Sequence, residues 1–102
     1  MAASASDVVV VDNPAASRFE AATPEGLAVA EYVKHGTTII FTHTEVPDAA
    51  RGGGVANALA RTALDAARRD GLTVVPRCPF FAVYVKRHHE YDDIVRPSME
   101  HR

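Results

Sequence analysis

The hydrophobic pattern of this 102-residue chain changes its period at a run of three glycines, Gly52 to Gly54. Before the run, apolar and polar residues alternate, as in a β-strand; after it, apolar residues recur every three to four positions, as in an amphipathic helix. A chain of this length forms one domain. The change of period therefore predicts an α+β fold, with the glycine run at the junction between a strand-rich half and a helical half.

Four strands are predicted before the glycines, because β-branched and aromatic runs are separated there by short turn signals. They cover residues 8–12, 17–22, 27–34 and 37–46. Connections this short favour an antiparallel meander. In the fourth strand, strict alternation puts one set of side chains on one face, namely Ile39, Phe41, His43 and Glu45.

After the glycines, the spacing predicts a helix that ends at Asp70-Gly71, a short apolar strand over 72–75, and a last helix from Pro79 to about His89. The strand–helix–strand unit should be a right-handed parallel crossover. The expected order is a meander followed by β-α-β-α, giving a mixed sheet flanked by helices. We expect the domain to occupy residues 7–97, between short tails at 1–6 and 98–102.

Charge and composition exclude several classes of protein. The net charge is −2 and the cationic residues are dispersed, whereas a nucleic-acid surface clusters them. No apolar run approaches the roughly 20 residues of a membrane span, and no secretory signal pattern opens the sequence. A single cysteine, Cys78, is expected to stay reduced in the cytoplasm. The small residues that dominate the apolar set predict a modest core, which is compatible with a monomer or a weak homodimer.

The segment Arg51-Gly-Gly-Gly-Val-Ala-Asn57 carries the clearest binding signal. It joins a strand to a helix start, where free backbone N–H groups and the positive end of the helix dipole meet. Glycines let a phosphate approach these donors, and Arg51 adds positive charge, so the segment suits a diphosphate. The alternative is a glycine-rich turn that only bends the chain. The Lys-Ser/Thr of a P-loop and the third glycine of a dinucleotide fingerprint are both missing.

The chain resembles the GCN5-related N-acetyltransferase superfamily, whose acetyl-CoA loop reads Gln/Arg-x-x-Gly-x-Gly/Ala. Arg51 to Ala56 fits that spacing. The likeness is narrower to a family of stand-alone minimal acetyltransferases of about a hundred residues. Three further pieces carry it: the Thr42–Pro47 segment, the Val74–Phe80 segment, and Tyr84 with His88-His89-Glu90-Tyr91.

The resemblance implies an acetyl-CoA-dependent N-acetyltransferase whose strands 37–46 and 72–75 splay apart to admit the pantetheine arm. It implies that backbone groups hold the CoA diphosphate and the thioester carbonyl. The expected cofactor-binding residues are Val46, Arg51, Gly52, Gly53, Gly54, Val55, Ala56 and Asn57.

Four side chains are candidates for the acetyl-transfer chemistry. Cys78 lies before a helix start and next to Arg77, as a nucleophile or proton donor would; the alternative is a small buried apolar residue. His43 could take the proton of the amine, and Glu45 could assist it, unless both are ordinary rim residues. Tyr84 matches the tyrosine that protonates the departing thiolate in larger relatives, or it packs in the core. No third ligand accompanies His43 and Glu45, so we predict no metal site.

The acceptor is expected to be an amine of a small molecule or a protein, with no nucleic-acid or membrane partner. An alternative of a different class is a non-catalytic acyl-CoA-binding or sensor domain of the same fold. Such a domain would need the glycine loop but none of the four chemical side chains.

Overall fold

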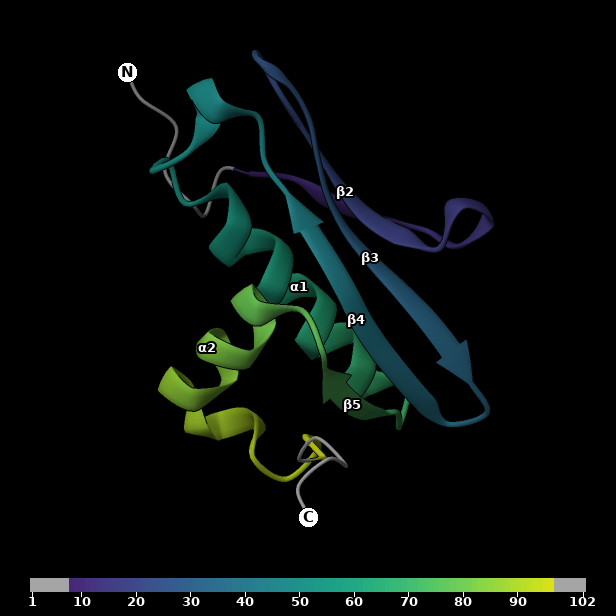
Figure 1. Ribbon diagram of the computed structural model, residues 1–102. Coiled ribbons are helices and arrows are strands. Elements are labelled where there is room, and N and C mark those ends of the chain that lie inside the picture. Colours follow the sequence, from purple (N-terminus) through teal and green to yellow (C-terminus); the bar gives the residue numbers. More distant parts are fainter. Residues whose placement is uncertain (1–7, 97–102) are drawn as a thin grey trace.

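The computed structural model describes residues 8–96 and contains one five-stranded sheet with two helices (Figure 1). The strand order follows the sequence, β1-β2-β3-β4-β5. The first four strands form an antiparallel meander, and β4 and β5 run parallel. The elements are β1 (Val10–Asn13), β2 (Arg18–Thr23), β3 (Gly26–His35), β4 (Thr38–Glu45), α1 (Val55–Arg69), β5 (Thr73–Pro76) and α2 (Pro79–Arg87).

These elements confirm the predicted order and the mixed sheet. The last helix ends at Arg87, two residues earlier than expected, and the short 3-10 helix η4 (His89–Tyr91) follows it. The predicted tails, 1–6 and 98–102, lie outside the described residues. No helix within residues 8–96 is long and apolar enough to cross a membrane.

Both helices lie on the same face of the sheet in Figure 1. Helix α1 contacts all five strands, and α2 packs against β4, β5 and α1. The buried positions of α1 recur every three to four residues, as the sequence pattern predicts: Val55, Ala58, Leu59, Ala60, Ala63, Leu64 and Ala67. Most of these residues are alanines, so the helix backbone can lie close to the sheet.

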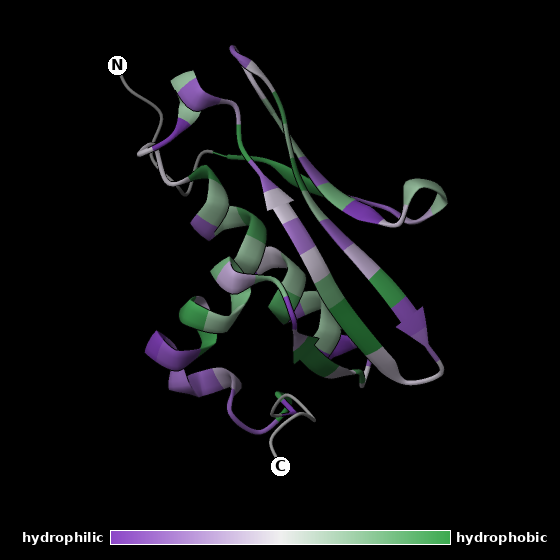
Figure 2. Cartoon of the chain, viewed as in Figure 1, coloured by the Kyte–Doolittle hydropathy of each residue, from purple (hydrophilic) through white to green (hydrophobic). Residues whose placement is uncertain are grey.

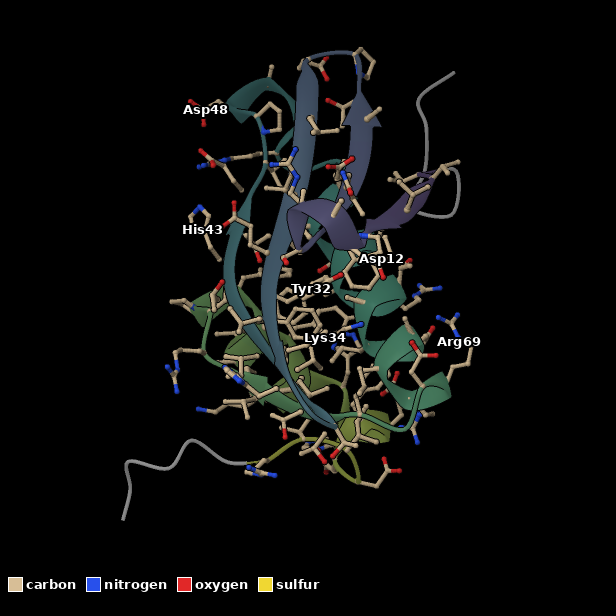
Figure 3. All side chains as sticks on the ribbon, turned by 90° about the vertical axis from the view of Figure 1, so that its right-hand side faces the viewer. Asp12, Tyr32, Lys34, His43, Asp48 and Arg69 are labelled. Atoms are coloured by element: carbon tan, nitrogen blue, oxygen red, sulfur yellow. The ribbon has the colours of Figure 1, made fainter. Side chains whose placement is uncertain are left out.

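The centre of the core is aromatic. Phe41 of β4 and Phe81 of α2 stack with their ring centroids 4.2 Å apart and their planes 7° from parallel. Tyr32 meets Phe41 edge-on and donates a hydrogen bond of 2.7 Å to Asp12 of β1 (Figure 3). These contacts tie α2 and the meander to the middle of β4.

A β-bulge changes which side chains of β4 face the helices. Glu31 pairs with His43, but the next residue of β3, Tyr32, pairs with Phe41, so Thr42 is an extra residue in β4. An extra residue shifts the alternation by one position. The expectation that His43 and Glu45 share a face with Ile39 and Phe41 is therefore wrong.

Beyond the bulge, Thr44 takes the helix-facing position, opposite the buried Ala30. The side chains of His43 and Glu45 are 56% and 71% exposed on the other face. Figure 3 shows His43 projecting outward from β4. The sequence pattern could not reveal this change, because a bulge depends on how two strands pair.

Candidate active site

The backbone of the glycine loop takes conformations that favour glycine. Gly52 and Gly54 have φ angles of +85° and +84°, in the left-handed region that strains other residues. A Cβ atom at Gly53 would lie 3.4 Å from the carbonyl oxygen of Ala50, in the short 3-10 helix η3 (Asp48–Ala50). The three glycines therefore turn the chain from the end of β4 into the start of α1.

The N-terminus of α1 is left uncapped by this turn. Gly54 is the N-cap residue, and no side chain caps the helix start. The first N–H groups of a helix have no partner within the helix, and they carry the positive end of its dipole. They adjoin a cavity of about 320 Å³ lined by loop residues together with Val46, Asn57 and Phe80.

Arg51 adds an exposed positive charge at the edge of this cavity. Its side chain is 68% exposed and lies 3.4 Å from Asp48 and 3.5 Å from the carbonyl oxygen of Val46. A surface pair of this kind contributes little to stability, so the guanidinium can turn to another anion at small cost. The loop thus offers backbone donors, space and charge in one place.

Strands β4 and β5 separate next to the loop. Their parallel pairing ends at Phe41 and Pro76, and β4 continues for four more residues to Glu45. The N–H of Cys78 donates a hydrogen bond of 2.8 Å to the carbonyl oxygen of Phe41 at the point of separation. In Figure 2 the part of β4 beside β5 is hydrophobic, and the part that extends past it is mostly hydrophilic. The last four residues of β4 therefore extend past the end of β5 on the side of the glycine loop.

Cys78 lies at this separation, as the N-cap residue of α2. It is 4% exposed, and its Sγ lies 3.3 Å from the hydroxyl oxygen of Thr44 on β4. A second cavity of about 320 Å³, lined by Thr44, Val46, Arg51, Ala56 and Phe80, shares four of these residues with the cavity at the loop. The two cavities thus adjoin along these shared residues, and we call them together the hollow, which extends from the start of α1 to Thr44.

Tyr84 lies in a different place. Its ring stacks on His88 at 3.8 Å and borders a polar pocket between α1 and the end of α2, which also contains Arg61. Burial raises the pKa of Tyr84 above its ordinary value, and the nearby Arg61 partly opposes this. Phe80 lines both cavities beside the glycine loop, and its ring centroid lies 6.1 Å from that of Tyr84. The structure thus does not bring Tyr84 into the cavity beside Cys78.

His43 and Glu45 lie on the outer face of β4, with His43 Nε2 3.5 Å from Glu45 Oε1. The sheet therefore separates this pair from the thiol of Cys78. Within residues 8–96, no group of three or more His, Cys, Asp or Glu residues could hold a metal ion.

Comparison with known proteins agrees with this geometry. The model of the GCN5-related N-acetyltransferase family matches residues 18–94, which is most of the chain. The chain belongs to this family. Its match spans four of the strands, both helices and the glycine loop.

A solved structure shows the same fold. It is the NMR solution structure of a protein from Staphylococcus aureus named a "GCN5-like putative N-acetyltransferase", with a TM-score of 0.70 and 23% identity. The alignment covers 92% of this chain and 93% of that one. No curated protein matches the chain significantly.

Sequence reasoning missed two residues of this candidate site. Thr44 lies in the Thr42–Pro47 segment that carries the family resemblance. Strict alternation from Phe41 predicted that its side chain faces away from the helices. Phe80 lines both cavities, yet in the sequence it resembles any apolar residue in the first turn of a helix. Two signals could have indicated it: Phe80 ends the Val74–Phe80 segment of the resemblance, and it directly follows Cys78-Pro79 in the first turn of α2.

Proposed function

We propose that the protein is an acetyl-CoA-dependent N-acetyltransferase that transfers an acetyl group to an amine. One observation carries the proposal: the hollow that connects the uncapped start of α1 to the gap between β4 and β5. The uncapped start of α1 suits a diphosphate, and the opening between β4 and β5 suits a thioester arm that must meet an acceptor. Family membership supports acetyl transfer as the reaction type.

The binding roles follow from the residues along the hollow. Backbone N–H groups of the Arg51–Ala56 segment would hold the diphosphate. Those of Arg51 and Gly53 already bond the carbonyl oxygens of Asp48 and Ala50, so the donors at Gly52 and from Gly54 to Ala56 are the ones we expect to bind it. The Arg51 side chain would neutralise it, and Asn57 would contact it from the first turn of α1. Val46, the residue directly after β4, would present backbone to the thioester arm.

Three candidates remain for proton and acetyl transfer. Cys78 would serve as proton donor or as transient acetyl carrier, because it is next to the inner end of the hollow. His43 with Glu45 would receive the proton of the amine on the outer face of β4, where an acceptor can arrive from solvent. Tyr84 is the acid we propose if Cys78 proves inert. The reduced thiol suits a cytoplasmic location.

The cofactor role is tested by thermal melting with acetyl-CoA. We expect millimolar acetyl-CoA to raise the melting temperature by several degrees, because a ligand at 100 times its Kd adds about 2.7 kcal/mol. The variant Arg51→Ala should bind roughly 5 to 10 times more weakly, as expected for the loss of one charge-assisted contact. Arg69→Ala, at the other end of α1, is the matched control and should bind as the wild type does.

Absence of a melting shift at millimolar acetyl-CoA would reject the proposal. A shift without thiol release in a screen of amine acceptors would instead indicate the sensor domain. In that case replacements of His43, Cys78 and Tyr84 would leave binding intact. The same screen would identify the acceptor.

A further inference from the structure

The thiol of Cys78 has a hydrogen-bond partner that the sequence analysis did not name as a candidate. Thr44 Oγ1 lies 3.3 Å from Sγ, and within residues 8–96 it is the one side-chain hydrogen-bond partner of that sulfur. The contact crosses from β4 to the N-cap of α2, at the place where β4 and β5 have separated. It therefore joins the two walls of the gap.

The bulge at Thr42 creates this contact. Without the extra residue, alternation from Phe41 would turn Thr44 to the outer face and His43 toward the helices. With it, Thr44 lies opposite Ala30, which is fully buried. A threonine also has few χ1 rotamers, so the hydroxyl has a restricted direction.

Thr44 also separates Cys78 from the cavity. The threonine lines the hollow with Val46, Ala56 and Phe80, whereas Cys78 is 4% exposed and does not line it. A group in the hollow would reach the sulfur past the threonine. Thr44 thus contacts the thiol through its hydroxyl and also lines the space that we assign to the thioester arm.

We propose that Thr44 is a positioning residue for Cys78: its hydroxyl directs Sγ toward the hollow and donates a hydrogen bond to the sulfur when the thiolate forms. This inference rests on the proposed function. A hydroxyl has one proton to donate and two lone pairs, so it can accept from the thiol and donate to the thiolate without a change of partner.

In the carrier route, the sulfur of Cys78 forms a bond to the acetyl carbon as the bond from that carbon to the CoA sulfur breaks. The proton of Cys78 ends on the CoA thiol. In the second half, His43 first takes one proton from the ammonium group. The neutral nitrogen then bonds to the acetyl carbon as the bond from that carbon to the Cys78 sulfur breaks, and the second proton of the nitrogen returns to Cys78. In the direct route, Cys78 supplies the proton to the CoA thiolate and regains one from the amine. The hydroxyl of Thr44 keeps its own proton in both routes.

The test compares Thr44→Val, which keeps the shape and loses the hydroxyl, with Thr44→Ser, which keeps the hydroxyl. The first readout is the alkylation rate of the thiol by iodoacetamide at pH 7.5, which needs no substrate and reports one site because Cys78 is the single cysteine. We expect the valine variant to react about tenfold more slowly, as for the loss of a hydrogen bond to a charged group. The serine variant should be within about threefold of the wild type.

The second readout is turnover. In the valine variant, kcat should fall about tenfold while KM for acetyl-CoA stays within about twofold, because the hydroxyl acts on the thiol and not on the diphosphate. Thr38→Val, at the opposite end of β4, is the matched control for the loss of a hydroxyl from this strand. All variants are compared at equal fractions folded, from their melting curves.

Wild-type alkylation in the valine variant would overturn the inference, as would a change in KM with no change in kcat. If the wild type transfers no acetyl group, the proposed function fails at that step. The alkylation rates then decide separately whether Thr44 positions the thiol.

Discussion

At the residue scale, the site is organised around one sulfur and the groups that can reach it. Cys78 contacts Thr44 at 3.3 Å on the helix-facing side of β4. His43 and Glu45, on the same strand, lie across the sheet from it. This division suits the proposed transfer, in which the acetyl donor would lie on the helix-facing side of β4 and the amine would arrive on the outer face.

Replacing Cys78 by alanine tests the role of the sulfur. If it is the acid or the acetyl carrier, kcat should fall by at least about 100-fold, as for a missing acid–base group, with KM for acetyl-CoA little changed. Mass spectrometry of the wild type with acetyl-CoA and no acceptor would show a protein heavier by one acetyl group if the carrier route operates.

Unchanged turnover in Cys78→Ala would reject the carrier route and leave direct transfer without the thiol. The loss of kcat is then expected in Tyr84→Phe, which keeps the ring stacked on His88 and removes only the hydroxyl.

At the element scale, α1 is the helix that both builds the core and presents the loop. Its buried face is mostly alanine, with Leu59 and Leu64 as the large side chains, both fully buried. Its start depends on positive φ angles at Gly52 and Gly54. The packing of the helix therefore fixes where its uncapped N–H groups point.

The packing of α1 is tested with two leucines of different burial. Leu59→Ala removes a side chain with 0% exposure, so we expect the free energy of unfolding to fall by about 3 kcal/mol. Leu27→Ala, at a β3 position with 45% exposure, is the matched control and should cost less than about 1 kcal/mol. Urea unfolding measures both. Equal losses would contradict the assignment of Leu59 to the core.

At the scale of the whole molecule, the segment after α2 closes the structure. Tyr91 donates a hydrogen bond of 2.6 Å to Asp65 of α1, and Val95 forms a parallel bridge to Val74 of β5. Arg68 of α1 pairs with Asp93 at 2.7 Å. These contacts hold the end of the described chain against α1 and β5, on the side away from the glycine loop.

The Arg68–Asp93 pair predicts a pH effect. The hydrogen bond from Arg68 lowers the pKa of Asp93, so the pair stabilises the fold above the ordinary carboxyl range and loses that contribution as pH falls through the lowered value. Asp93→Asn should therefore lower the melting temperature at pH 7, and the difference from wild type should shrink as the pH falls through the lowered pKa of Asp93. Both side chains are partly exposed, so the effect should be small and weaker in high salt.

Glu25→Gln, in the turn between β2 and β3, serves as the control for loss of a surface carboxylate. A melting difference for Asp93→Asn that is the same at pH 3 and pH 7 would show that the pair does not act through its charge.

The sequence by itself determined the elements, their order and the glycine loop, because these depend on local periodicity and on backbone conformations that favour glycine. The stripe of α1, the meander and the parallel β5 all follow from such patterns. The family resemblance of the Arg51–Ala56 segment was equally local, and the family match over residues 18–94 confirmed it.

Only the tertiary structure decided which side chains meet. One extra residue, Thr42, turned His43 and Glu45 away from the helices and brought Thr44 to the sulfur of Cys78. A bulge arises from the pairing of two strands, so neither strand's sequence reveals it. Likewise, Phe80 separates Tyr84 from the cavity beside Cys78 because α2 packs on α1 and β4, and that depends on the whole core.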